Sequence, residues 1–309
     1  MVGAGISGLT CALRLSEAGH AVRVVAELPP SGTTSAVAAA LWYPYRALPQ
    51  AAVTRWAATT FRVLQGLAGE PAAGVRMRAG RELFRTPVGN PWWRDAVPNL
   101  SHLTDLPAGY TDGYRLVVPV VDPSVHLPWL VDRLGRRGVP VEVGRRLRRL
   151  DDADHGADVV VDCSGLGAEQ LADDRTLVPV RGQVVVVEQV GLTEWVLDES
   201  NQCDLAYVVP RERTVVLGGT ADVGMRDGRV DPVTARAVVE RCAALVPQVA
   251  GAAVVAHKVG LRPTRPAVRV EAGVLPSGRP VVHDYGHGGA GVTLSYGCAE
   301  DVAALVAGL

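Results

Sequence analysis

The sequence predicts an α/β fold (α+β overall) in which a Rossmann-like nucleotide-binding domain carries an inserted antiparallel-sheet domain. Three observations predict this fold. A glycine-rich turn, GAGISG, begins at residue 3 and leads into a helical pattern. Strand and helix patterns then alternate near both ends of the chain. Between them, several strand-like runs follow one another without a helical pattern, as in an antiparallel sheet.

The first expected element is a helix over residues 5–18, because apolar side chains recur there on one face. A strand follows over residues 20–27. The strand that usually precedes the first glycine of such a turn is missing, since only Met1 and Val2 stand there. We therefore expect either that the start is clipped or that another segment fills this gap in the sheet.

The middle of the chain continues the alternation less regularly. Proline, glycine and tryptophan are frequent between residues 71 and 125, which predicts loops mixed with short strands. The other expected elements are a helix over 53–67, a helix over 124–138, a strand over 139–143, and a buried strand that runs into a glycine turn over 157–167.

Four strand-like runs lie between residues 182 and 222, and a hairpin-sized gap joins the last two, which predicts an antiparallel sheet. A helix is expected over 231–247, with Asp231 as its N-cap and Pro232 in its first position. A strand, a glycine loop and a final helix complete the chain over 279–309.

This interleaving predicts two discontinuous domains. Residues 1–50, 137–180 and 256–309 form the expected nucleotide-binding domain. Residues 51–136 and 181–255 form the expected substrate-binding domain.

The composition excludes several classes of protein. The 309 residues carry a net charge of −1, so no nucleic-acid partner is expected. No run of 18 apolar residues and no secretory leader are present, so no membrane association is expected. Five cysteines are scattered along the chain, which predicts reduced thiols and a cytoplasmic location.

The glycine turn and the helix after it are predicted to bind a dinucleotide. The first glycine permits a tight turn, the second lets the backbone approach a pyrophosphate, and the third lets the helix pack on the sheet. The free N–H groups at the helix N-terminus favour phosphate. An acidic residue at the end of the next strand is placed to accept from a ribose hydroxyl. The residues assigned here are Gly3, Gly5, Ile6, Ser7, Gly8 and Glu27.

The motif alone does not distinguish NAD from FAD. A later strand of the nucleotide-binding pattern arrives only at residue 158, and the last glycine loop arrives at residue 286. Such interleaving favours an FAD oxidoreductase over a nicotinamide dehydrogenase.

Several stretches together resemble the D-amino-acid oxidase family, which is closely related to D-aspartate oxidase. They are TTSAVAAALWYPY, VRGQ, YVVP with LGGT, GLRPTRP, and DYGHGGAGVTLSYGCA, and they span nearly the whole chain in the family's order. The resemblance implies non-covalent FAD and oxidation of a D-amino acid by hydride transfer from its α-carbon to flavin N5. The imino acid then reacts with water to give a 2-oxo acid and ammonia, and dioxygen reoxidises the flavin to give hydrogen peroxide.

The resemblance also implies a substrate site. Arg262, in GLRPTRP, matches the arginine that binds the substrate carboxylate, and its planar fork suits that task. Arg265 is the second choice. Tyr207 matches a tyrosine whose hydroxyl meets the same carboxylate. Gly289 matches the residue whose carbonyl receives the substrate amine.

Further matches imply contacts with the cofactor. A hydroxyl cluster should lie near the pyrophosphate, small residues should pass the flavin, and the last glycine loop should begin a helix aimed at the flavin, with Thr293 as a hydroxyl donor. The residues implied are Thr33, Thr34, Ser35, Ala40, Leu41, Leu147, Ser164, Gly165, Arg262, Gly286, His287, Gly288, Gly289, Gly291, Val292 and Thr293.

The chain departs from the family in two places. Cys203 stands where the family often has a second active-site tyrosine, and the long mobile lid of some members is absent, so product release should be quick. Tyr43 and Tyr45 are expected either to line the pocket or to lie in the core. The expected partners are a D-amino acid, with a neutral side chain favoured, and dioxygen. A homodimer is compatible with the family, although the sequence shows no interface signal.

Other functions stay open at this point. A D-aspartate oxidase would need a second cation in the pocket, for which Arg46 and Arg211 are candidates, whereas Asp198, Glu199 and Asp204 would disfavour an acidic substrate. The remaining alternatives are a glycine or sarcosine oxidase, a nicotinamide-dependent dehydrogenase, and a non-catalytic nucleotide-binding module.

Overall fold

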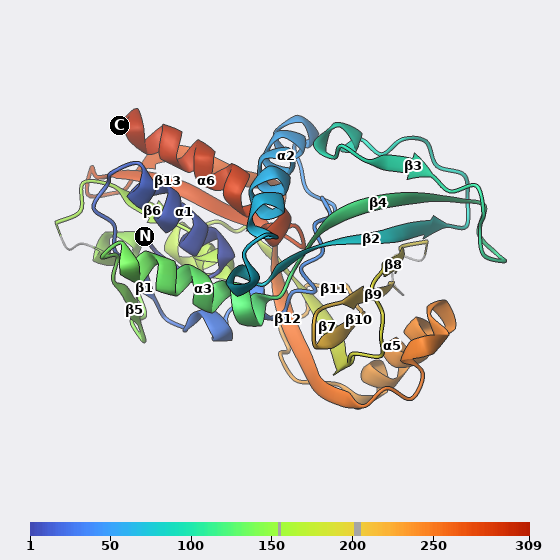
Figure 1. Cartoon of the computed structure of the whole chain (residues 1–309). Coiled ribbons are helices and arrows are strands. Elements are labelled where there is room, and N and C mark those ends of the chain that lie inside the picture. Colours follow the sequence, from blue (N-terminus) through green and yellow to red (C-terminus); the bar gives the residue numbers. More distant parts are fainter. Residues whose placement is uncertain (154–155, 201–204) are drawn as a thin grey trace.

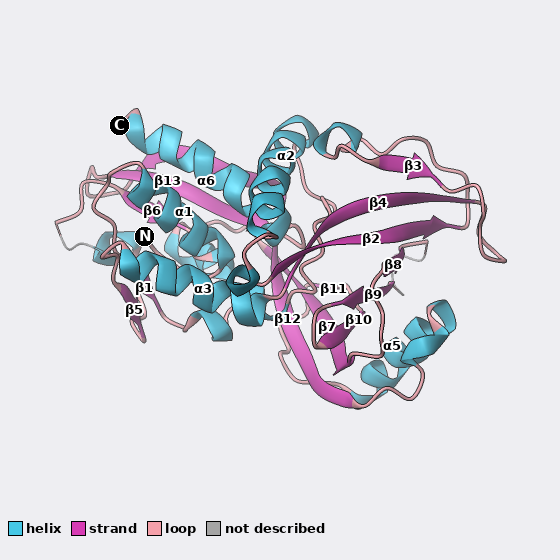
Figure 2. Cartoon of the chain, viewed as in Figure 1, coloured by secondary structure: helices cyan, strands magenta, loops and turns pink. Residues whose placement is uncertain are grey.

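The computed structural model describes residues 1–153, 156–200 and 205–309, so Cys203 and Asp204 lie outside the described residues. Helices and short strands gather around both chain termini, and long strands extend away from them on the other side of the molecule (Figures 1 and 2). The arrangement confirms the predicted mixture of an α/β region and an antiparallel sheet.

Short parallel strands build the region around the termini. Strand β1 (Val24–Ala26) pairs with β5 (Val141–Val143), and β6 (Val160–Asp162) pairs with β13 (Pro280–His287). Val2 bridges β1 and β6 in parallel, with its N–H 2.8 Å from the Val161 carbonyl oxygen. The first residues of the chain therefore occupy the gap that the sequence analysis found in the sheet.

The second region is the antiparallel sheet. Its strands follow the order β3–β4–β2–β8–β9–β10–β7–β12, and β11 pairs with β7. The predicted antiparallel pairing is confirmed for β8 with β9, β9 with β10 and β10 with β7, whereas β2 and β8 pair in parallel. The bounds are β2 (Val75–Phe84), β3 (Leu100–His102), β4 (Asp112–Val121), β7 (Val178–Glu188), β8 (Trp195–Asp198), β9 (Ala206–Pro210), β10 (Thr214–Gly218), β11 (Asp222–Val223) and β12 (Val254–Val274).

Two strands differ most from expectation. Residues 71–125 contain the long strands β2 and β4, which pair over ten residues, instead of loops and short strands only. Strand β12 runs for 21 residues through Pro263 and Pro266. It pairs with β7 as far as Thr264, which also pairs with His287 of β13, and after an irregularity it pairs with β13 from Arg269 onward. The prolines, which cannot donate to a ladder, thus lie near the point where β12 changes partner.

The helices are α1 (Ile6–Glu17), α2 (Gln50–Leu67), α3 (Pro123–Arg136), α4 (Ala168–Leu171), α5 (Pro232–Leu245) and α6 (Gly291–Ala307). The predicted cap of α5 is confirmed, because the Asp231 side chain accepts from the N–H groups of Val233 and Thr234. Short 3₁₀ helices occupy Pro30–Gly32, Thr34–Val37, Pro71–Ala73, Arg94–Ala96, Leu150–Ala153, Gly165–Gly167 and Pro247–Val249. No helix among the described residues is long and apolar enough to cross a membrane.

The two largest apolar clusters among the described residues support these regions. One joins α1, α2 and α6 to β2 and β4, and it includes Leu9, Trp56 and Leu294, which are fully or nearly fully buried. The other lies between α5 and strands β7 to β10, where Val238 packs near Leu217. Packing against these two clusters holds the strands that carry the candidate site in place. The site lies between the region around the termini and the antiparallel sheet. The domain boundaries given above stay a prediction.

Candidate active site

One cavity of about 490 Å³ contacts both the glycine turn before α1 and the arginine of β12. The start of α1, the end of β1, the segment over 33–43, the turn after β6 and the loop before α6 form its walls, together with parts of β7, β8, β9 and β12. Every predicted site residue lines this cavity except Gly8 and Gly286.

Gly8 and Gly286 support the walls from outside. A Cβ on Gly8 would lie 2.0 Å from the carbonyl oxygen of Gly3, so only glycine lets α1 pack against the turn. Gly286, at φ +83°, faces Arg265, and an added Cβ would lie 2.8 Å from the Arg265 Cβ. Both positions favour glycine for packing, and neither reaches the cavity.

The end of the cavity near β1 has the features of a nucleotide site. Gly3 adopts φ +105°, a conformation that L side chains rarely adopt. Glu27 lines the cavity directly after β1, and Leu147 and Arg145 lie at the same cavity. The helices α1 and α6 both begin at the cavity wall, and neither has an acidic residue in its first turn. Their positive ends therefore stay available to an anionic group.

The predicted hydroxyl cluster also lines the cavity, but the protein already engages its hydroxyls. Thr33 donates to the Pro30 carbonyl at 2.7 Å, and Thr34 donates to the Leu261 carbonyl at 3.0 Å. The remaining two also have protein partners: Ser35 Oγ accepts the Ile6 N–H at 2.9 Å, and Ser164 Oγ donates to Asp162 at 2.6 Å. These bonds hold the cavity wall in shape. Thr33, Thr34 and Ser164 can therefore only accept from a ligand, whereas Ser35 can still donate its hydroxyl hydrogen.

The segment through Ala40 is fixed on both sides. Ala40 adopts φ +58°, an uncommon conformation for a residue other than glycine, and its carbonyl accepts the Val121 N–H at 2.9 Å. The buried Arg211 donates to the Ala38 carbonyl at 2.6 Å and lies 3.5 Å from the Asp122 carboxylate. Strained backbone that its surroundings hold in place is typical of functional sites.

At the other end of the cavity, Arg262 is fixed with its guanidinium against a glycine. Its Nη1 donates to the Thr220 carbonyl at 2.9 Å. A Cβ on Gly182 would lie 2.4 to 2.5 Å from the guanidinium atoms, so any side chain at this position would displace the group. The VRGQ motif thus contains a glycine that makes room for the arginine.

Tyr207 has a similar arrangement. A Cβ on Gly218 would lie 1.9 Å from the Tyr207 ring, so the glycine provides the space that the ring fills. Burial raises the pKa of the Tyr207 hydroxyl, and the charge of Arg262 opposes this rise. The hydroxyl therefore stays protonated at neutral pH and can donate toward the cavity.

The alternative cations do not reach this cavity. Arg265 lies three residues from Arg262 on β12 and points to the other face of the strand, where its Nε donates to Asp174 at 2.8 Å. Arg211 is engaged as described above, and Arg46 is exposed with its guanidinium carbon 5.0 Å from the centre of the Tyr45 ring. Among the described residues that line the cavity, the cationic side chains are those of Arg145 and Arg262.

Both tyrosines that the sequence left undecided line the cavity. Tyr45 packs over Gly289, and its buried hydroxyl has no hydrogen-bond partner in the described part of the chain. Tyr43 donates to Glu82 at 2.6 Å, and its backbone N–H and carbonyl both bind the Thr293 hydroxyl at 3.0 Å. The hydrogen of Thr293 is thus engaged with the Tyr43 carbonyl.

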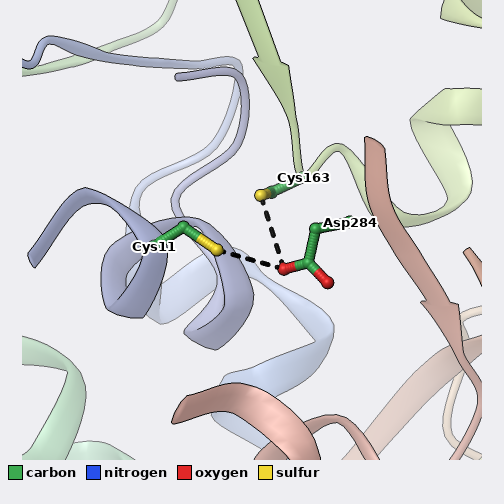
Figure 3. A group of neighbouring side chains, drawn as sticks. All are labelled: Cys11, Cys163 and Asp284. Carbon is green, nitrogen blue, oxygen red and sulfur yellow. Dashed lines mark hydrogen bonds between the residues drawn. The ribbon is translucent and has the colours of Figure 1, made fainter. Parts of the chain in front are cut away.

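A carboxylate and two thiols meet behind the glycine turn (Figure 3). Asp284 is completely buried, and it accepts from Cys11 Sγ at 3.2 Å and from Cys163 Sγ at 3.7 Å. His287 Nε2 lies 3.1 Å from the other Asp284 oxygen. Burial raises the pKa of both thiols, to about 11 for Cys163, so they donate to Asp284 as neutral thiols. The group positions the Asp284 carboxylate at the cavity wall.

The residues present fit the FAD that the sequence predicts. Glycine backbone and the N-terminus of α1 line one end, where a pyrophosphate is expected, and small side chains such as Ala40 line the centre. The unpartnered Tyr45 hydroxyl and the clustered Arg262 and Tyr207 face the same space at the other end. A cavity with polar groups converging at one end and a nucleotide grip at the other suits a cofactor and a small substrate together.

The buried carboxyl group of Glu82 predicts how the stability of the protein depends on pH. Burial raises the pKa of its carboxyl from 4.5 to about 8, while the hydrogen bond from Tyr43 opposes the rise and the charge of Glu199 adds to it. The folded state therefore binds this proton more tightly than the unfolded chain does. Protonation of Glu82 contributes fully to the free energy of unfolding below about pH 4.5, and this contribution is lost as pH rises through about 8.

Glu82→Gln should remove this dependence while its amide oxygen still accepts from Tyr43. Thermal unfolding of both proteins, measured from pH 5 to 9, should show the wild type losing stability relative to the variant by up to ~1.4 kcal/mol per pH unit within the titration range. Two curves that stay parallel across this range would contradict the assignment.

Comparison with known proteins identifies similar chains. The model of the family described as FAD dependent oxidoreductase (DAO) matches residues 1–305. The chain is 51% identical to a D-amino-acid oxidase of Rubrobacter xylanophilus, over 99% of this chain and 94% of that protein. It is 34% identical to the D-aspartate oxidase of Homo sapiens, over 99% of this chain and 93% of that protein. Its fold is similar to the crystal structure of an iminodiacetate oxidase from Chelativorans sp. BNC1, with a TM-score of 0.80 at 20% identity, covering 99% and 94% of the two chains.

Proposed function

Because the chain belongs to the FAD-dependent oxidoreductase family DAO, we propose that it is a D-amino-acid oxidase acting on neutral D-amino acids. The products would be 2-oxo acids, ammonia and hydrogen peroxide. The observation that carries the proposal is the position of Arg262, whose guanidinium is fixed at the cavity beside Tyr207, and whose side chain lies close to Gly289, just before α6. The predicted family is confirmed, and FAD is the cofactor of this family.

The cofactor would lie along the wall from Glu27 to the start of α6. When bound, FAD accepts a hydride from the substrate and passes its electrons to dioxygen. The residues proposed to hold it are Gly3, Gly5, Ile6, Ser7, Glu27, Thr33, Thr34, Ser35, Ala40, Leu41, Leu147, Ser164, Gly165, His287, Gly288, Gly291, Val292 and Thr293.

The chain's own contribution to the reaction is alignment. Arg262 would bind the substrate carboxylate through two parallel hydrogen bonds, and the Tyr207 hydroxyl would donate a third. The Gly289 carbonyl would accept from the amine. With two substituents of the α-carbon fixed, only one enantiomer directs its hydrogen toward the cofactor, and such positioning can supply ~7–11 kcal/mol of a barrier.

The charges of the cavity favour a neutral over an acidic side chain. A D-aspartate oxidase would need a second cation near Arg262, and neither Arg46 nor Arg211 lines the cavity. The acidic residue that does line this end is Glu199. These features support the proposal for neutral substrates, although one relative is a D-aspartate oxidase.

The location and the assembly also belong to the proposal. Cys11, Cys163, Cys242 and Cys298 are free and buried, which suits a reducing compartment, and we propose a cytoplasmic location. The homodimer stays a prediction.

A peroxide assay tests the function. The purified protein should release hydrogen peroxide with D-alanine and D-phenylalanine, far less with D-aspartate, and none with L-alanine. Glycine and sarcosine serve as probes for the amine-oxidase alternative. Faster turnover of D-aspartate, or of sarcosine, would contradict the proposed substrate class.

A further inference from the structure

We propose that Glu199 selects the substrate side chain, favouring D-amino acids that carry a terminal ammonium, such as D-lysine, and rejecting those that carry a second carboxylate. The inference rests on the proposed function and widens its substrates from neutral side chains to those that carry a terminal ammonium. It assigns a specificity role to a residue that takes no part in aligning the α-carbon.

Glu199 directly follows the last residue of β8, and it lines the cavity. Side chains alternate between the two faces of a strand, and both Leu197 and Glu199 line the cavity. Asp198, between them, points to the other face, where it accepts from Tyr110 at 2.7 Å and from Arg85 at 3.3 Å. Of this acidic pair, therefore, one carboxylate is neutralised within the protein and the other faces the substrate end of the cavity.

Glu199 has no partner of its own in the described part of the chain. Neither of its oxygens forms a hydrogen bond or ion pair with another described residue. Burial raises the pKa of its carboxyl to about 7, and the charges of Arg46 and Arg262 oppose this rise while Asp198 adds to it. A partly buried carboxylate without a partner is unfavourable, and a cation placed beside it relieves that cost.

The other groups around Glu199 do not replace such a cation. Arg46 is exposed and stacks over Tyr45, so solvent screens its charge. Arg262 is the one described cation at this end of the cavity wall, and the substrate carboxylate would neutralise it on binding. Glu82 is a second buried carboxyl group nearby, already bonded to Tyr43. The bound substrate thus leaves the Glu199 carboxylate without a free cation beside it on the cavity wall, so this carboxylate attracts an ammonium and repels a second carboxylate.

The unpartnered hydroxyl of Tyr45 adds a second polar contact at this end. It is buried, lines the same cavity and accepts or donates according to its ligand. A terminal ammonium has three donors, enough for both Glu199 and Tyr45.

A matched substrate pair tests the inference at about pH 8, above the pKa of Glu199. D-Lysine and D-norleucine differ mainly in the terminal ammonium. The ratio of their kcat/KM values should fall roughly 10- to 100-fold in Glu199→Gln, the range expected for one charge-assisted hydrogen bond. Glu194→Gln is the matched control, because Glu194 pairs with Arg115 at 2.7 Å away from the cavity, and its ratio should equal that of the wild type.

A binding series gives a readout without turnover. Hexanoate, 6-aminohexanoate and adipate correspond to the neutral, cationic and anionic side chains without the reactive amine. Their affinity for the holoenzyme can be measured by perturbation of the flavin absorbance. The wild type should bind 6-aminohexanoate most tightly and adipate least, and Glu199→Gln should reduce this preference by the same factor as the kinetic ratio.

The outcomes separate the two claims. A wild type that binds adipate as tightly as 6-aminohexanoate, or a Gln variant with an unchanged ratio, would overturn the role of Glu199 while D-alanine turnover still upheld the oxidase. Absence of turnover with every D-amino acid would instead refute the proposed function, and the binding series would still decide the role of Glu199.

Discussion

Arg262→Ala is expected to keep its FAD and to lose nearly all turnover of D-amino acids. Arg262 lines the substrate end of the cavity, whereas the nucleotide end is built from the glycine turn, Glu27 and the α1 N-terminus. Each charge-assisted hydrogen bond that the guanidinium makes is worth ~1.5–3 kcal/mol, so losing two lowers kcat/KM by roughly 10²- to 10⁴-fold. Steady-state peroxide release and the ratio of flavin to protein absorbance measure the two effects.

Two further variants test whether the loss of turnover is specific to the guanidinium of Arg262. Arg265→Ala removes an arginine three residues away on β12 that pairs with Asp174 and does not line the cavity, and it should keep most of the activity. Arg262→Lys keeps the charge but not the planar fork, so it should recover only part of the loss. Wild-type kinetics in Arg262→Ala, or equal losses in the two alanine variants, would remove Arg262 from the substrate site.

Gly5→Val should leave the protein folded and without tightly bound FAD. Gly5 lines the cavity next to the start of α1, and an added Cβ would lie 3.1 Å from Ser35 Oγ, so the valine branches must extend into the space assigned to the pyrophosphate. Because Gly5 has φ −76°, its backbone tolerates the substitution. Loss of two phosphate contacts at ~1.5 kcal/mol each weakens binding by at least about 100-fold.

The cofactor affinity of the Gly5 variant can be measured by titrating FAD into protein that has been stripped of flavin. The matched control is Gly135→Val on α3, where a Cβ meets no atom within 4 Å and the site is remote from the cavity. That control should bind FAD as the wild type does. A Gly5→Val protein that purifies with a full complement of FAD would contradict the placement of the pyrophosphate.

The sequence predicted the features that depend on local pattern. The α5 cap at Asp231 and the helix after the last glycine loop follow from short-range chemistry, and both are found. The family resemblance added what spacing alone does not contain: it singled out Arg262 from Arg265, and the structure shows that only Arg262 lines the cavity.

What the sequence missed depends on contacts between distant segments. Strand β12 was not recognised because Pro263 and Pro266 argue against a central strand, and only the change of partner explains them. The role of Gly182 as the space for Arg262 depends on pairing between β7 and β12, which no local signal contains. Glu199, directly after β8, lines the cavity while Asp198 does not, and only the folded structure shows which of these neighbours faces the cavity.

The account rests on an asymmetric cavity that orients one enantiomer toward bound FAD, and an anaerobic visible spectrum tests this most directly. Addition of D-alanine to the purified holoenzyme without oxygen should bleach the flavin absorbance, and admission of air should restore it. The same concentration of L-alanine should leave the spectrum unbleached. Equal bleaching by both enantiomers, or none by either D-alanine or any other neutral D-amino acid, would contradict the account.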